Sequence, residues 1–135
     1  MKALSTILWI GFLCVQAMSA WAGVDLKAPS LDSAFEVRVF PRDGQVLVGR
    51  YHQWVVQVTD PNGQVIDNAS MTVAGGMEAH GHGLPSKPQI TRYLGDGQYL
   101  IEGMLFNMAG RWTLLFVIQT PQVMDRVRFD FDIEF

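Results

Sequence analysis

Strict alternation of apolar and polar residues is the feature that most restricts the fold of this chain. It is clearest at residues 126–135, where the apolar members are Val127, Phe129, Phe131, Ile133 and Phe135 and the residues between them are charged. Successive side chains of a strand project to opposite faces, so this pattern predicts an antiparallel strand with one buried face. No segment shows sustained helical periodicity, and the sequence therefore predicts an all-β chain.

Turn signals divide the rest of the chain into short extended segments. Asp60-Pro61-Asn62-Gly63 is a turn because proline presets φ and Asn-Gly tolerates positive φ, and Gly95-Asp96-Gly97 predicts a hairpin between two strands. The predicted strands are residues 35–39, 45–48, 54–59, 64–66, 69–73, 89–94, 98–102, 111–119 and 126–135. We therefore expect an immunoglobulin-like antiparallel β-sandwich of seven or eight strands at residues 35–135.

The N-terminal residues have the form of a secretory signal peptide. Lys2 precedes an apolar core, and Ala20-Trp21-Ala22 predicts cleavage before Gly23. The alternative is an uncleaved membrane anchor, because the apolar stretch approaches the ~20 residues of a spanning helix. We predict a signal peptide at residues 1–22, a flexible lead-in at residues 23–34, and a periplasmic or secreted protein with no stable membrane span after cleavage.

Composition excludes several classes of site. The single cysteine, Cys14, lies in the predicted signal peptide, so the mature chain has no thiolate ligand and no disulfide. Without Lys2, nine Lys and Arg residues stand against thirteen Asp and Glu residues, a net charge of −4 with no basic run. Nucleic acid is therefore not an expected partner.

Residues 74–88 form the longest stretch without strand character, and they hold two of the three histidines. His80 and His82 are separated by one glycine, and side chains two residues apart in an extended chain project to the same side. Met77 lies three residues upstream of His80 and adds a thioether. Imidazole and thioether without thiolate form a ligand set that favours copper, so the sequence predicts a copper site here.

Each of these residues has a structural alternative. The His80-Gly81-His82-Gly83 segment is also compatible with a structural turn whose imidazoles bind backbone carbonyls. Met108 lies in an expected turn and is the better additional ligand, whereas Met104 ends an expected strand and suits the core. Glu78 is either an oxygen ligand, a partner of an imidazole N–H, or a solvated carboxylate. His52 stands alone at a strand start and is expected to be a structural group.

Several motifs recur as a set across the chain. They are Gly75-Gly76-Met77, His80-Gly81-His82-Gly83 with Pro85, Leu94-Gly95-Asp96-Gly97 with Tyr99, and Glu102-Gly103-Met104 with Phe106, Met108, Gly110 and Trp112. Together they resemble the YtkA-like domain family over about residues 47–131. The resemblance implies an exported or membrane-tethered bacterial β-sandwich associated with copper handling and cytochrome oxidase assembly. The positions that it marks as important are Met77, His80, His82, Met104 and Met108.

The chain departs from the family pattern at two positions. Glu78 stands where family members often carry proline, and Ala109 stands where they often carry proline or another turn residue. Because proline restricts the backbone, the first departure is expected to loosen the loop that leads to the histidine pair.

We predict that the protein is a metal-binding module that delivers or buffers copper, with a copper donor or acceptor protein as its partner. The alternative is a periplasmic interaction protein without metal that docks a membrane or respiratory complex through its end loops, near Leu84 and Phe106. A copper-dependent redox enzyme would need His52 as a third nitrogen ligand. No catalytic motif assembles in the sequence, so we expect no enzymatic activity.

Overall fold

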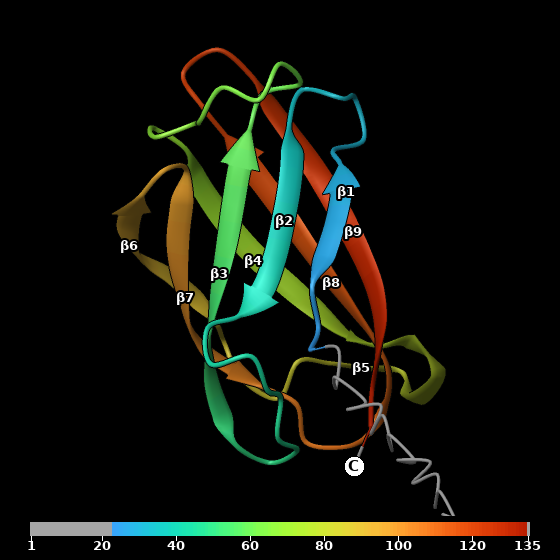
Figure 1. Cartoon of the computed structure of the whole chain (residues 1–135). Helices are drawn as coiled ribbons and strands as arrows, with labels where there is room; N and C mark the ends of the chain where they lie inside the picture. Colours follow the sequence, from blue (N-terminus) through green and yellow to red (C-terminus); the bar gives the residue numbers. More distant parts are fainter. Residues whose placement is uncertain (1–22, 135) are drawn as a thin grey trace, which may run out of the picture.

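Two antiparallel sheets packed face to face make up residues 23–134, the part of the chain that the computed structural model describes (Figure 1). One sheet has the strand order β1-β2-β3-β7-β6 and the other has the order β5-β4-β8-β9. The elements are β1 (Leu26–Pro29), β2 (Glu36–Pro41), β3 (Tyr51–Thr59), β4 (Ser70–Met77), η1 (Glu78–His80), β5 (His82–Gly83), β6 (Gln89–Gly95), β7 (Gln98–Leu105), β8 (Gly110–Gln119) and β9 (Met124–Ile133). The prediction of an all-β, immunoglobulin-like sandwich is confirmed.

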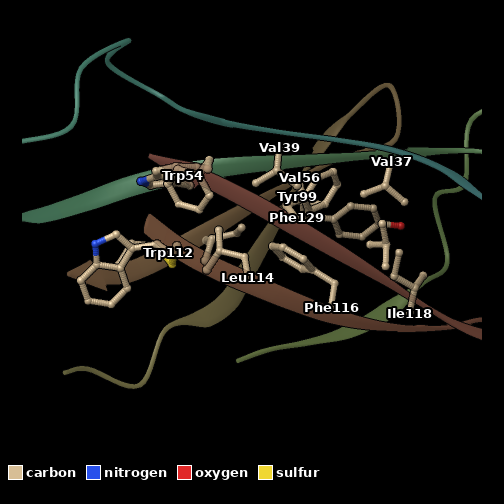
Figure 2. Close-up of a cluster of buried hydrophobic side chains, with 14 of the residues drawn as sticks. Val37, Val39, Trp54, Val56, Tyr99, Trp112, Leu114, Phe116, Ile118 and Phe129 are labelled. Atoms are coloured by element: carbon tan, nitrogen blue, oxygen red, sulfur yellow. The ribbon is translucent and has the colours of Figure 1, made fainter. Parts of the chain in front are cut away.

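The core lies between the two sheets and is built from the alternating apolar positions. On β9, Val127, Phe129, Phe131 and Ile133 are buried while the charged residues between them are exposed, as the sequence pattern predicts. Trp54 and Trp112 are fully buried at one end of this cluster, with smaller side chains beyond them (Figure 2). Burial of such large apolar side chains is the main favourable contribution to folding.

The described residues form nine strands rather than seven or eight, because two short strands are added to the seven predicted segments that form strands. One of these is β1, which lies in the segment predicted to be a flexible lead-in and pairs with β2 from Leu26 to Pro29. The Asp125 carboxylate accepts hydrogen bonds from the Asp32 and Ala34 backbone N–H groups at 3.0 and 3.3 Å. Tertiary contacts with β9 therefore order a segment that shows no periodicity of its own.

Two predicted strands do not form. Residues 45–48 form a non-strand connection between β2 and β3, and residues 64–66 contribute one isolated bridge, between Val65 and Thr59. The hairpin predicted at Gly95-Asp96-Gly97 is present between β6 and β7, and Asp96 has a φ of 52°. An aspartate tolerates this left-handed conformation better than most residues, which suits it to the turn.

Three connections meet at one end of the sandwich, the lower end in Figure 1. They join β2 to β3, β4 to β6 through η1 and β5, and β7 to β8. The Gly49 N–H donates to the Phe106 carbonyl at 2.8 Å, which ties the first connection to the third. This end contains the histidine pair and the methionines that the sequence singles out.

The predicted signal peptide at residues 1–22 lies outside the described residues, as does Phe135. Among the residues that are described, no helix combines the length and the apolar character needed to cross a membrane.

Candidate functional site

The segment predicted as a loop at residues 74–88 begins as a strand and folds back on itself. Strand β4 continues through Gly75 and Gly76 to Met77, the single turn η1 follows, and β5 then pairs with the end of β4. Gly76 lies opposite Gly83, and a Cβ at Gly76 would come within 2.3 Å of the His82 carbonyl oxygen. Only a glycine at this position therefore lets β5 approach β4 so closely.

Gly81 reverses the chain between the two histidines. It has a φ of 66°, a left-handed conformation that glycine adopts without a steric penalty, and its N–H donates to the Glu78 carbonyl at 3.1 Å. The turn brings the His80 and His82 rings to a centroid separation of 6.0 Å, and both side chains are exposed. The convergence expected from an extended chain is thus achieved by a turn instead.

Hydrogen bonding defines the tautomer of His82. Its Nδ1 lies 2.9 Å from the Gly83 carbonyl oxygen, and a carbonyl only accepts, so Nδ1 carries the proton. In the neutral ring, Nε2 then has a free lone pair, which is the arrangement that metal-binding histidines commonly show. On its other side the His82 ring makes a T-shaped contact with the Trp112 indole, at 5.9 Å between centroids.

The centroid spacing of the two imidazoles meets the distance limit for two rings on a common metal ion. A ring nitrogen bound at about 2.0–2.1 Å places its ring centroid about 3.2 Å from the ion, so two rings on one ion stand at most about 6.4 Å apart. The observed 6.0 Å falls within this limit. Nitrogen ligands of this kind suit copper and zinc, whereas calcium and magnesium require oxygen.

The three methionines marked by the sequence occupy different environments. Met77 is the cross-strand partner of His82 and is buried in the core, with its methyl group 2.8 Å from the position that a Cβ would take at Gly110. Met104 is fully buried in the same core cluster. Met108 is half-buried, and its carbonyl accepts a hydrogen bond from the Trp112 indole N–H at 3.1 Å.

Glu78 is exposed to solvent, as one of the expected alternatives has it, and it also makes an ion pair. Its carboxylate lies 2.9 Å from Nη1 of Arg128, on the outer face of β9. The same guanidinium holds Asp130 through two hydrogen bonds, at 3.0 and 2.9 Å, and Thr113 also donates to Asp130. The hydrogen bonds from Arg128 and Thr113 hold the pKa of Asp130 below its usual value.

His52 is bound by the loop that precedes it. Its Nε2 lies 3.0 Å from the Leu47 backbone nitrogen and 2.9 Å from the Leu47 carbonyl oxygen. These contacts agree with the expectation that His52 is a structural group, which closes the connection between β2 and β3.

The surface beside the histidine pair is hollowed. A depression of about 370 Å³ is lined mainly by apolar atoms and is bordered by Gly76, Met77, His82, Thr113 and Leu115. A larger depression of about 480 Å³ runs between β4 and residues 84–90 and includes neither His80 nor His82. Within residues 23–134, no group of three or more His, Cys, Asp or Glu side chains is placed to hold a metal ion.

Two residues of this end were not singled out for the site by sequence reasoning. Trp112 contacts both His82 and Met108, and Arg128 holds Glu78. A bulky aromatic residue two positions after Gly110 suggests core packing, and an arginine on an alternating strand suggests an exposed face. Only the pairing of strands distant in sequence brings them to the histidine turn.

Comparison with known proteins identifies the family and a set of structural neighbours. A sequence model described as YtkA-like matches residues 34–116. Comparison with curated proteins gives no match.

The structural neighbours include two crystal structures of FetP from uropathogenic E. coli strain F11. The "as isolated" protein, expressed in the periplasm of E. coli, is similar with a TM-score of 0.51 and 10% identity, covering 83% of this chain and 93% of that chain. A copper-bound Glu-to-Gln variant of FetP is similar with a TM-score of 0.50 and 13% identity, covering 84% and 90%. At these identities the likeness establishes the fold alone.

Proposed function

We propose that this chain, which belongs to the YtkA-like family, is an exported protein that binds copper through His80 and His82 at one end of its β-sandwich, for delivery or buffering. The observation that carries the proposal is the pair of imidazole rings 6.0 Å apart, one of them with its Nε2 lone pair left free by a hydrogen bond from Nδ1. The proposal assigns the site to binding and gives the protein no catalytic activity.

Methionine sulfur would complete the site. Met77 is the first candidate because it lies directly opposite His82 across β4 and β5 and paired residues share a face, although its side chain is buried in the same core cluster as Met104. Met108 is the second candidate, since its backbone is held by the same Trp112 that contacts His82. Met104 is packed in the core cluster, and we assign it to structure. A thioether beside two imidazoles favours Cu(I) over Zn²⁺.

Two further observations support copper and export. The fold is shared with FetP, of which one solved variant is described as copper-bound and another preparation was expressed in the periplasm. The N-terminal sequence has the charged, apolar and small-residue regions of a signal peptide. A protein so exported meets copper outside the cytoplasm, where a donor or acceptor protein would be its partner.

A thermal melt with Cu(I) and with Cu(II) tests the proposal. A ligand that binds only the folded state, at 100 times its Kd, stabilises by about 2.7 kcal/mol, which raises Tm by roughly 10 °C for a chain of this size. We expect this rise in the wild type and its loss in the His80→Ala/His82→Ala variant.

His52→Ala is the matched control, because it removes the remaining histidine of the chain. It should lower Tm by opening the connection between β2 and β3, while leaving the copper-dependent rise unchanged. A copper response that persists without His80 and His82, or that disappears with His52, would contradict the proposed site.

A docking role without metal is the second candidate function. Leu47 and Tyr51 are apolar and exposed at the same end of the sandwich, by 50% and 71%. Phe106, which was expected near the docking surface, is fully buried and contributes to the core instead. A partner that binds equally well with and without copper, and loses binding with Leu47→Ser/Tyr51→Ser, would favour this candidate.

A further inference from the structure

The turn that carries His80 has little of its own to hold it in place. None of the three residues of η1 is buried, and no side chain caps its N-terminus. Among the described residues, the η1 side chains make one polar contact, which is the ion pair between Glu78 and Arg128 at 2.9 Å. The backbone of the turn is held at its ends by the pairing of β4 with β5 and by the Gly81 N–H, and the one polar side-chain tie of η1 is to Arg128.

Arg128 is itself hydrogen-bonded to the second sheet. Its Nε and Nη2 atoms donate to the two carboxylate oxygens of Asp130, at 3.0 and 2.9 Å, and Thr113 on β8 donates to the same carboxylate. Two of the three guanidinium nitrogens are thus committed to the sheet, and the third is left to meet Glu78. A planar guanidinium pre-organised in this way loses little further freedom when it binds a second carboxylate.

We propose that Arg128 is a positioning residue for the histidine pair. Through Glu78, Arg128 holds the η1 turn against the outer face of the second sheet. This contact sets where the His80 ring lies relative to the His82 ring. This inference rests on the proposed copper function. It also explains how glutamate at position 78 restrains the turn, where the family resemblance led us to expect a loosened loop. Arg128 acts through Glu78 and has no contact with the proposed ligands among the described interactions.

A purely electrostatic role and a positioning role predict opposite effects on copper binding when Arg128 is replaced. Arg128 is a cation near a cation site, so its electrostatic effect on copper is unfavourable, and Arg128→Met would tighten binding if charge dominated. If Arg128 orders the turn, the same variant lowers the fraction of molecules with the ligands in place and weakens binding. Glu78→Gln weakens binding on either account.

The experiment is a double-mutant cycle on the full-length chain, with Cu(I) affinity measured by competition against a chromophoric chelator. An exposed ion pair stabilises one geometry only modestly, so Glu78→Gln and Arg128→Met should each raise the Kd about two- to fivefold. The double variant should raise the Kd no more than either single variant does. Arg111→Met is the matched control. It removes the arginine of another ion pair on this face, Arg111 with Asp132 at 3.2 Å, and should leave the Kd unchanged.

A second measurement separates this inference from the copper function. In the metal-free protein, NMR order parameters of the residue 79–81 amides should fall from about 0.85 to below about 0.6 in Glu78→Gln and Arg128→Met, with Tm nearly constant. Wild-type protein that binds no copper would refute the proposed function, and the order parameters would then decide the positioning role alone. Unchanged order parameters, or tighter copper binding by Arg128→Met, would overturn the role of Arg128.

Discussion

Gly76→Ala provides a sharp test of how the site is built, because the structure sets the size of the disturbance. A Cβ at this position would lie 2.3 Å from the His82 carbonyl oxygen and 2.7 Å from the Gly83 Cα, both of them backbone atoms. To restore an ordinary contact of 3.4 Å, the His82 carbonyl must move by about 1.1 Å. Metal sites hold their ligand distances within about 0.2 Å, so a shift of this size displaces His82 as a ligand.

The expected cost has two parts. Forcing an extra methyl group into a tight backbone contact destabilises by about 1–3 kcal/mol, and each kcal/mol lowers Tm by about 3–6 °C for a chain of this size. Loss of a well-placed imidazole should weaken copper binding about 10- to 100-fold, the range seen when the groups that orient metal ligands are removed. Copper titration and thermal melts of the metal-free protein measure the two effects separately.

Gly83→Ala is the matched control for this prediction. Its Cβ would lie 3.5 Å from the Gly75 carbonyl oxygen, an ordinary contact, and the residue does not have a positive φ. It should keep both Tm and copper affinity close to those of the wild type. If Gly76→Ala bound copper as the wild type does and melted at the same temperature, close approach of β5 to β4 would not be what places His82.

Two further predictions concern the scaffold. Burial raises the pKa of Asp125, but hydrogen bonds to its carboxylate outweigh this effect and lower the pKa overall. The ionised carboxylate therefore contributes its full stabilisation to the fold above about pH 5. This contribution is lost as the pH falls past the unfolded-state pKa of about 3.9 and through the folded-state pKa. Asp125→Asn should destabilise by about 1.5–3 kcal/mol at pH 7, and urea unfolding should show this difference shrinking as the pH falls below about 3.9; a difference constant with pH would contradict it. Tyr99→Phe leaves the Ala69 N–H and the Ile66 carbonyl without their shared hydroxyl, at 3.1 and 2.8 Å, and should cost about 1–3 kcal/mol in thermal unfolding. Tyr51→Phe, at an exposed tyrosine, should cost nothing measurable, and an equal loss in both variants would refute the assignment.

Much of the scaffold could be predicted from local pattern. Residues 126–135 alternate so regularly that the buried face of β9 follows from the sequence, because a strand has a side-chain period of two. The turn at Asp96 was equally readable, since its neighbours are glycines that accept positive φ. Strand β1 was missed because it is four residues long and is ordered by β2 and by Asp125, about a hundred residues away in sequence.

For the candidate site, the sequence alone identified the residue types and their spacing, and hence the copper prediction. It could not show that His80 and His82 converge through a left-handed Gly81 rather than along an extended strand. Nor could it show that Glu78 is held by a residue fifty positions away. Both depend on which strands become neighbours.

The sequence by itself determined that this protein is a sandwich of short strands with a glycine-rich histidine segment, because strand periodicity and turn preferences are local properties of the chain. Only the tertiary structure decided the roles of the individual side chains. Met77 and Met104 are buried, His52 is bound by its own loop, and Arg128 reaches Glu78, because burial and ion pairing depend on the packing of two sheets whose strands are distant in sequence.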